Sequence, residues 1–337
     1  MKAVVIEKQG AVALREVEKP SPPPGFVRVA VKAAAVCATD LEAISGGVAV
    51  NYPLIPGHEW SGVVDAAADD AGRKFIGKRV TGSNDVVCHT CPACVSGNLR
   101  YCPDFKEIGF KKDGAYAEYV CVPAYGLCEL PDSVPFTSAA LAEPIGVALG
   151  TLDKADAKAG ETLLVIGAGS IGLCMLQAAR AIGMRKIVVA AQSGRRLSIA
   201  KKLGAFATVE TRGGGLKAAM EELHPGGSDV VVDATGAEAC IQDALKIARK
   251  GGRVALAGYG KGAVMSIRID DIHINNLKLI GAGNNWNKIG QAVRMMGDGA
   301  VDPQPLVTET LRLEQYDRAL ELARTRPEGF VKAVFVF

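Results

Sequence analysis

The stretch TLLVIGAGSIGLCML, residues 162–176, combines a run of apolar residues, a glycine-rich turn and the start of an apolar helix. Glycines in this order permit a tight turn, a close approach of the backbone to a pyrophosphate and close packing of helix against strand. The first helical amides can then donate to phosphate oxygens. The pattern predicts a dinucleotide site formed by Gly167, Ala168, Gly169, Ser170, Ile171 and Gly172. The alternative is a glycine-rich turn without a function.

Further apolar runs follow this stretch at intervals, and helical patterns separate most of them. The runs cover residues 186–190, 229–233, 253–257 and 277–280. Strands that alternate with helices form a parallel sheet, so we expect an α/β fold with a doubly wound Rossmann domain. Residues 1–130 instead show short β segments between loops, which predict a second, β-rich domain.

The end of the second predicted strand bears on the choice of cofactor. An acidic residue about 20 positions beyond the glycines would bind the adenosine ribose, and Ala191 occupies that place. Ser193, Arg195 and Arg196 follow, and arginine binds a 2′-phosphate through charge-assisted bonds. We therefore expect NADP(H) in preference to NAD(H). The alternative is that the arginines form the solvated start of a helix.

The composition argues against several classes of protein. Of 337 residues, 39 are basic and 36 acidic, so the formal net charge is only +3 and gives no sign of a nucleic-acid partner. No apolar run reaches the roughly 18 residues of a membrane span. The start, MKAVVIEKQG, holds an apolar run too short for a secretory signal peptide. We expect a cytoplasmic protein that binds neither a membrane nor nucleic acid.

Four of the nine cysteines lie within fifteen positions, namely Cys88, Cys91, Cys94 and Cys102. Four thiolates in one loop suit a closed tetrahedral zinc site. A disulfide scaffold would be smaller and more evenly cross-linked. The spacing therefore predicts a structural zinc lobe at residues 88–102. An iron–sulfur cluster and a nucleic-acid-binding zinc finger are the alternatives, and the finger lacks an accompanying basic patch.

A second set of metal-binding residue types is spread along the chain. It comprises Cys37, His58, Glu59 and Glu143, with Thr39 and Asp40 just after the cysteine. A thiolate, an imidazole and carboxylates suit a catalytic metal with an open coordination position. Asp40 is a candidate to orient the ring of His58. Taken singly, each residue has a structural explanation, such as a buried cysteine or a glutamate at the start of a helix.

Together these motifs resemble those of the zinc-dependent medium-chain dehydrogenases, the alcohol and polyol dehydrogenase group, over almost the whole chain. The resemblance rests on CATD at 37–40, GHEWSG at 57–62, the four cysteines, DGAYAEY at 113–119, EP at 143–144 and the glycine turn. It implies a GroES-like catalytic domain, a Rossmann domain and an active site in the cleft between them. It also implies two zinc ions per chain, one structural and one catalytic, the latter held by Cys37, His58 and Glu59 or Glu143.

The resemblance further implies a reaction. Glu143 stands where simple alcohol dehydrogenases have a cysteine and polyol dehydrogenases have glutamate, which favours sorbitol-, galactitol-phosphate- and cyclitol-type enzymes. Among these, PGHEWSGVV at 56–64 and IGFKKDG at 108–114 resemble the 2-deoxy-scyllo-inosamine dehydrogenases. A hydride would pass between a secondary alcohol of a polyol or cyclitol and the nicotinamide, and Thr39 would pass on the proton. Sugar-alcohol phosphates, aminocyclitols, L-threonine and simple alcohols are alternative substrates. The candidate pocket residues are Phe110, Asn284 and Asn285.

The same resemblance predicts the organisation of the chain. Residues 1–147 form the catalytic domain, residues 148–285 the Rossmann domain, and residues 286–337 return to the catalytic domain, in a homodimer or homotetramer. Thr235 and Tyr259 are weaker candidates for cofactor contacts, with a core role as the alternative for Tyr259. Glu42 stands where several relatives carry a relay histidine, so the proton path beyond Thr39 stays open. The rival hypothesis is a non-catalytic NADP(H)-binding zinc protein.

Overall fold

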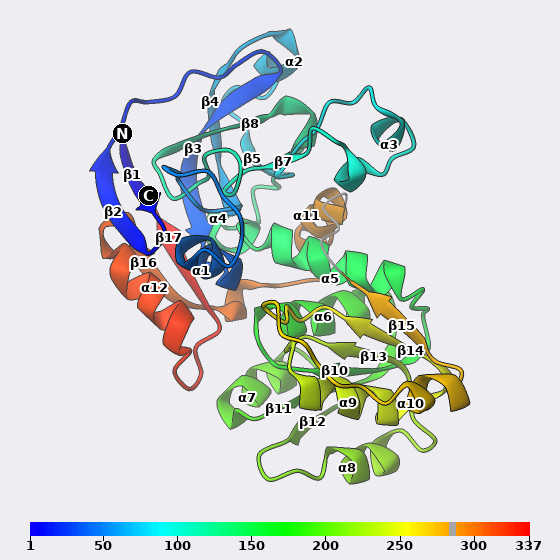
Figure 1. The fold of residues 1–337 in the computed structure, drawn as a ribbon. Helices are drawn as coiled ribbons and strands as arrows, with labels where there is room; N and C mark the ends of the chain where they lie inside the picture. Colours follow the sequence, from blue (N-terminus) through cyan, green and yellow to red (C-terminus); the bar gives the residue numbers. More distant parts are fainter. Residues whose placement is uncertain (283–287) are drawn as a thin grey trace.

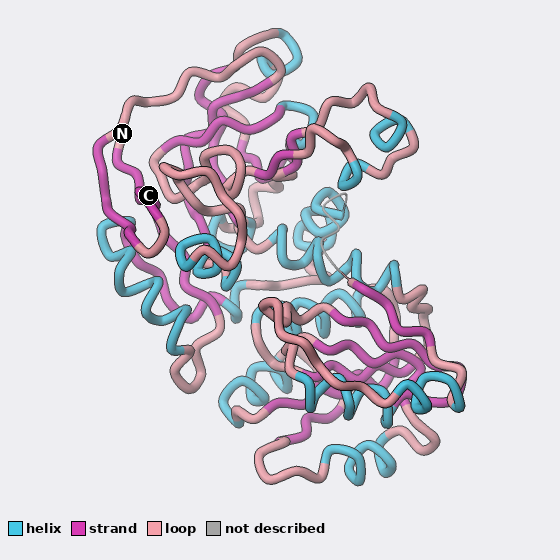
Figure 2. Tube along the Cα trace, viewed as in Figure 1, coloured by secondary structure: helices cyan, strands magenta, loops and turns pink. Residues whose placement is uncertain are grey.

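The computed structural model describes residues 1–282 and 288–337 and contains two large sheets (Figures 1 and 2). One apolar cluster contains residues of both sheets, and each sheet has a further cluster of its own. The first is a six-stranded sheet with the order β12-β11-β10-β13-β14-β15, in which every neighbouring pair is parallel. Its strands are β10 (Thr162–Ile166), β11 (Arg185–Ala191), β12 (Ala207–Glu210), β13 (Ser228–Asp233), β14 (Ala248–Leu256) and β15 (Lys278–Gly281). This is the Rossmann strand order, so the expectation of a doubly wound sheet is confirmed.

Helices connect these strands, as βαβ units require. They are α6 (Ser170–Ala181), α7 (Gly194–Lys202), α8 (Leu216–Leu223), α9 (Glu238–Ile247) and α10 (Ile269–Ile274). The predicted apolar runs coincide with strands, because the strands are buried on both faces and carry continuous apolar side chains. Strand β12 was not predicted, since its four residues are only partly buried or exposed.

The second sheet has seven strands and is antiparallel apart from the pair β16 and β17. Its strands are β3 (Phe26–Ala35), β4 (Glu59–Ala67), β5 (Arg79–Gly82), β8 (Tyr119–Pro123), β9 (Leu127–Glu129), β16 (Val307–Arg312) and β17 (Lys332–Val336). Two short two-stranded sheets accompany it, β1 (Lys2–Lys8) with β2 (Ala11–Glu16) and β6 (Asp85–Val86) with β7 (Lys106–Glu107). Trp60, Tyr116 and Phe335 are the largest side chains of its core.

The end of the chain lies within this second sheet. Strand β17 pairs antiparallel with β3, with Val334 opposite Ala35, and β16 lies on its other side. Both termini therefore lie on the same part of the molecule (Figure 1). The helices of this part are α1 (Ala38–Ser45), α2 (Asp70–Arg73), α3 (Pro92–Val95), α4 (Phe136–Ala139) and α12 (Tyr316–Thr325).

Helix α5 (Ala142–Lys154) joins the two parts, because it packs against α6 beside the Rossmann sheet and contacts β4 of the seven-stranded sheet. It also packs against α11 (Ile289–Gly297). Ten of its thirteen residues are buried, which explains its apolar sequence. Glu143 lies in its first turn and is buried. Among the described residues, no helix has both the length and the apolar character needed to cross a membrane.

Candidate active site

Cys37 and Thr39 are positioned by the start of α1. Cys37 is the N-cap of this helix, and its amide donates to Oδ2 of Asp40 at 2.9 Å. The hydroxyl of Thr39 donates to Sγ of Cys37 at 3.1 Å and lies 3.4 Å from Nε2 of His58. The helix start therefore brings a thiol and a hydroxyl to one face of the imidazole.

Asp40 holds the other side of that imidazole. Its fully buried carboxylate lies 3.2 Å from Nδ1 of His58 and accepts a hydrogen bond of 2.5 Å from the hydroxyl of Tyr116. Burial alone would raise the pKa of Asp40, but His58, Tyr116 and the Cys37 amide outweigh it and lower the pKa. The ionised carboxylate favours a proton on Nδ1, which leaves Nε2 facing Thr39 and Cys37. Tyr116 was not predicted as a member of this group.

Glu59 is paired with a residue from the far end of the chain. Its Oε1 accepts a hydrogen bond of 2.7 Å from Nζ of Lys332 on β17, and both side chains are buried. Lys332 also donates to the carbonyl oxygen of Val36 at 3.2 Å, and its pKa is raised because its ionic partners outweigh the effect of burial. In the described part of the chain, Oε2 of Glu59 is buried without a hydrogen-bond partner. Lys332 was missed because a lysine in an apolar strand carries no local signal.

The ligand atoms of Cys37, His58 and Glu59 lie within 4.8 Å of one another. This set of sulfur, nitrogen and oxygen suits Zn²⁺, and the unpartnered Oε2 of Glu59 would gain the ligand it lacks. Glu143 does not belong to this close group, although it is buried, and burial raises its pKa to about 8. The structure thus gathers three of the four predicted ligands and places the fourth nearby on α5.

Phe110 lies against the imidazole of His58, with ring centroids 5.0 Å apart. Glu107, three residues earlier, has a largely buried side chain, and burial raises its pKa. Its Oε2 lies 3.6 Å from Nη1 of Arg100, which belongs to the cysteine-rich lobe. Asn284 and Asn285, the other predicted pocket residues, lie outside the described residues.

The four predicted lobe cysteines also come together. Their sulfur atoms lie within 4.8 Å of one another, with Cys88 3.9 Å from Cys94 and 3.6 Å from Cys102. A tetrahedral zinc site with bonds of about 2.3 Å requires sulfur separations of about 3.8 Å, so the cage fits the ion. Hydrogen bonds from Thr90 lower the pKa of Cys88 to about 6, while burial raises that of Cys94 to about 12. None of the nine cysteines, all within the described residues, forms a disulfide.

The glycine turn has the geometry that a dinucleotide site requires. Gly167 has φ of 112°, and a Cβ atom at Gly172 would lie 1.8 Å from the carbonyl oxygen of Gly167. Gly169 faces open space and precedes the first turn of α6, so its backbone is accessible to a ligand. Thr235 lies against the turn, since a Cβ atom at Gly167 would be 2.9 Å from its methyl group. Tyr259 is 55% exposed, which excludes the alternative core role.

The predicted 2′-phosphate residues lie where β11 ends and α7 begins. Ala191 is the last residue of β11, and Ser193 caps α7 by accepting from the amide of Arg196. Arg195 is exposed, whereas Arg196 donates to the carbonyl oxygen of Arg326 at 3.3 Å. No sequence pattern identified the carboxylate that lies at this position, that of Glu210. Glu210 is the partner of Ala191 on the neighbouring strand. The Oε2 atom of Glu210 lies 3.8 Å from the position that a Cβ atom of Gly194 would take.

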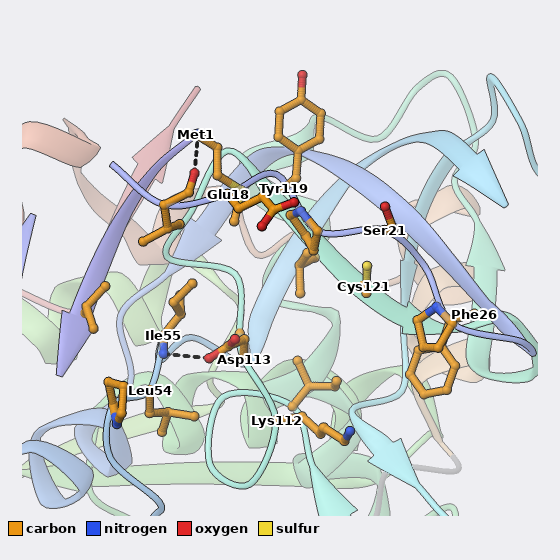
Figure 3. A pocket seen from close by; sticks show the side chains of 18 residues that line it. Met1, Glu18, Ser21, Phe26, Leu54, Ile55, Lys112, Asp113, Tyr119 and Cys121 are labelled. Carbon is orange, nitrogen blue, oxygen red and sulfur yellow. Dashed lines mark hydrogen bonds between the residues drawn. The ribbon is translucent and has the colours of Figure 1, made fainter. Parts of the chain in front are cut away.

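A separate hollow of about 350 Å³ lies beside the N-terminal segment (Figure 3). Met1, Glu18, Ile55, Asp113 and Cys121 are among its lining residues, and Asp113 accepts from the amide of Ile55 at 3.0 Å. The residues that line it do not include the close group around His58. We therefore assign the chemistry to the metal-ligand group and not to this hollow.

Comparison with known proteins agrees with this geometry. Residues 23–132 match the family of the alcohol dehydrogenase GroES-like domain, and residues 170–297 match the family of zinc-binding dehydrogenases. Sorbitol dehydrogenase from Bacillus subtilis is 30% identical, over 96% of this chain and 93% of its own length.

Two solved structures are similar over the whole chain. A zinc-binding dehydrogenase from Sinorhizobium meliloti bound to NADP has a TM-score of 0.92 with 29% identity, and covers 100% of this chain and 99% of its own. A short chain alcohol dehydrogenase from Escherichia coli complexed with NADH has a TM-score of 0.93 with 27% identity and the same coverage. The fold and site define a two-domain alcohol dehydrogenase that uses a nicotinamide nucleotide. The chain belongs to the zinc-dependent medium-chain dehydrogenase family.

Proposed function

We propose that this enzyme transfers a hydride between a secondary alcohol of a polyol or cyclitol, or the matching ketone, and NADP(H) in preference to NAD(H). The close group of Cys37, His58 and Glu59, with the Thr39 hydroxyl beside it, is the observation that carries the proposal. The proposed enzyme holds two zinc ions per chain and acts as a homodimer or homotetramer in the cytoplasm. Its catalytic domain comprises residues 1–147 and 286–337, around a Rossmann domain of residues 148–285.

The chain's own residues have separate tasks in this proposal. Cys37, His58 and Glu59 would hold zinc, with Glu143 as a second carboxylate, and the bound ion would polarise the substrate oxygen. Thr39, whose hydroxyl contacts both Cys37 and His58, would pass on the proton of the substrate hydroxyl, releasing its own proton as it takes up the substrate's. Phe110 shields one side of the imidazole from water. The amides that follow Gly167 would bind the pyrophosphate of the cofactor, which carries the hydride.

The proposal is tested by zinc content and by turnover across a panel of polyols, cyclitols, L-threonine and simple alcohols. We expect Cys37→Ala to lose the catalytic zinc and turnover, while Cys121→Ala, a cysteine of β8 outside both metal groups, keeps them. A folded chain with two bound zinc ions that oxidises no alcohol would favour the rival function of cofactor binding without turnover.

The cofactor preference has its own test. Arg195→Ala should weaken NADP(H) binding and leave NAD(H) binding unchanged, because only the former carries a 2′-phosphate. Ala191→Asp should shift the ratio of kcat/KM for NADP(H) to that for NAD(H) by about tenfold towards NAD(H), since the new carboxylate repels the phosphate and accepts from the ribose hydroxyls. Stronger use of NAD(H) by the unaltered enzyme would instead assign the ribose to the nearby Glu210.

A further inference from the structure

An ion pair that includes none of the candidate metal ligands joins the two parts of the molecule. Glu42, on α1, lies 2.7 Å through its Oε1 from Nζ of Lys261, which lies in the segment between β14 and α10. This yellow segment lies below α1 in Figure 1. The side chain of Glu42 is 15% exposed and that of Lys261 58%, so one end of the pair is sheltered and the other is in solvent.

The backbone around both residues makes room for this contact. Helix α1 ends at Gly46 with φ of 87°, and a Cβ atom at Gly47 would lie 2.6 Å from Oε2 of Glu42. A larger residue at position 47 would therefore displace the carboxylate. Lys261 has φ of 54°, in the left-handed region that lysine seldom occupies. The segment thus holds Lys261 in an unfavourable backbone conformation while its side chain reaches α1.

The segment that carries Lys261 also packs on the cofactor-binding edge of the Rossmann sheet. A Cβ atom at Gly258 would lie 2.0 Å from the amide nitrogen of Gly236, and one at Gly236 would lie 2.5 Å from the carbonyl oxygen of Tyr259. The neighbouring Thr235 in turn lies against Gly167 of the glycine turn. Continuous close contacts therefore connect Lys261 with the turn.

We propose that Glu42 and Lys261 are positioning residues that hold α1 against the cofactor-binding edge of the Rossmann sheet. The inference rests on the proposed placement of the cofactor at residues 167–172. Helix α1 carries Thr39, and residues 39 and 42 lie on one face because they are three positions apart. The pair thus fixes the distance between the proton-accepting hydroxyl and the cofactor. It acts equally on both nucleotides, because it involves neither Ala191 nor the arginines that follow it.

The test compares Glu42→Gln, Lys261→Met and the double variant in the zinc-loaded full chain. We expect each single variant to raise the dissociation constants of both NADPH and NADH by about two- to fivefold. The double variant should be no weaker than either single variant, because the same interaction is removed in each. The exchange Glu42→Lys with Lys261→Glu should restore binding in part, which a merely structural role of either side chain would not produce. Binding is measured by the fluorescence of the reduced nucleotides.

Lys2 and Glu314 provide a matched control, since they form an ion pair of 2.6 Å that lies wholly within the catalytic part. Lys2→Met and Glu314→Gln should leave nucleotide binding unchanged. Unaltered binding in the Glu42 and Lys261 variants, or an effect on one nucleotide alone, would overturn the proposed pair while the proposed function stands. Failure of the parent chain to bind either nucleotide would overturn the proposed function itself, and the positioning role with it.

Discussion

Asp40 organises the candidate metal site although it is not a candidate ligand. It accepts from the Cys37 amide and from the Tyr116 hydroxyl, and its other oxygen faces Nδ1 of His58. The sequence predicts its partnership with His58 because the CATD and GHE motifs are short and local. It does not predict Tyr116 or Lys332, because their contacts join segments that are 76 and 273 residues apart in the chain.

Replacing Asp40 by asparagine should weaken zinc binding at the Cys37–His58–Glu59 group. The neutral amide no longer favours the proton on Nδ1, and outer partners of this kind typically contribute about 10- to 100-fold in metal affinity. Zinc retention against a competing chelator measures the effect, and Tyr116→Phe, which removes one of the three contacts, should show a smaller loss. Asp65→Asn, in an ion pair with Arg28, is the surface control. Equal zinc retention in Asp40→Asn and the parent would contradict the role.

The raised pKa of Asp85 predicts that the free energy of unfolding depends on pH. Burial, followed by the nearby Glu107, raises its pKa from 3.8 to about 7. The folded chain therefore keeps a proton that the unfolded chain releases, so the stability from this group is present below about pH 4 and is lost as the pH rises through 7. Three pKa units correspond to at most about 4 kcal/mol.

Asp85→Asn should accordingly reduce the loss of unfolding free energy between pH 5 and pH 8. Urea unfolding of parent and variant at both pH values measures this difference. Asp104→Asn, at an exposed position, is the control and should follow the parent. A variant as pH-dependent as the parent would show that Asp85 is ionised throughout.

Among the elements, the lobe of residues 88–102 has almost no apolar interior of its own. Its only buried residues are Cys94 and Cys102, while Val95 and Tyr101 are 76% and 77% exposed. A loop without a core depends on its cross-links. The cysteine spacing makes this lobe predictable from the sequence. Strand β12 is not predictable in this way, because its four residues, ATVE at 207–210, are too few to show a pattern.

Loss of the lobe zinc should therefore unfold the lobe locally. Cys102→Ser should raise amide hydrogen exchange across residues 88–105 and leave the strands of the Rossmann sheet protected, because their core is separate. Cys121→Ser should leave exchange in the lobe unchanged. Continued protection of the lobe in Cys102→Ser would show that the loop holds its shape without four sulfur ligands.

For the whole molecule, the pair Glu59 and Lys332 ties together positions 273 residues apart. The alternating sequence at the end of the chain predicts a strand, but its place beside β3 depends on a pairing that no local pattern specifies. Both side chains of this ion pair are buried, so the stability of the fold depends on both charges being present.

In the metal-free chain, Lys332→Met should lower the free energy of unfolding by about 3–5 kcal/mol, because it leaves the Glu59 carboxylate buried and unpaired. Adding Glu59→Gln should recover part of that loss, since no uncompensated charge remains. Arg15→Met, which breaks the exposed pair with Glu7, should cost about 1 kcal/mol or less. If the double variant lost the sum of the unfolding free energies lost by the two single variants, Glu59 and Lys332 would not stabilise the fold through their ion pair.

The late position of β16 and β17 also sets an order of biosynthesis. All six Rossmann strands lie between residues 162 and 281, so that sheet can form before residues 307–336 are synthesised. The catalytic sheet must wait for residues 307–336, and Glu59 meets its counter-ion only when Lys332 emerges. We therefore expect the nascent chain to form its Rossmann sheet first, so that a metal ion supplied early in translation would find the candidate ligand Glu59 without the support of Lys332.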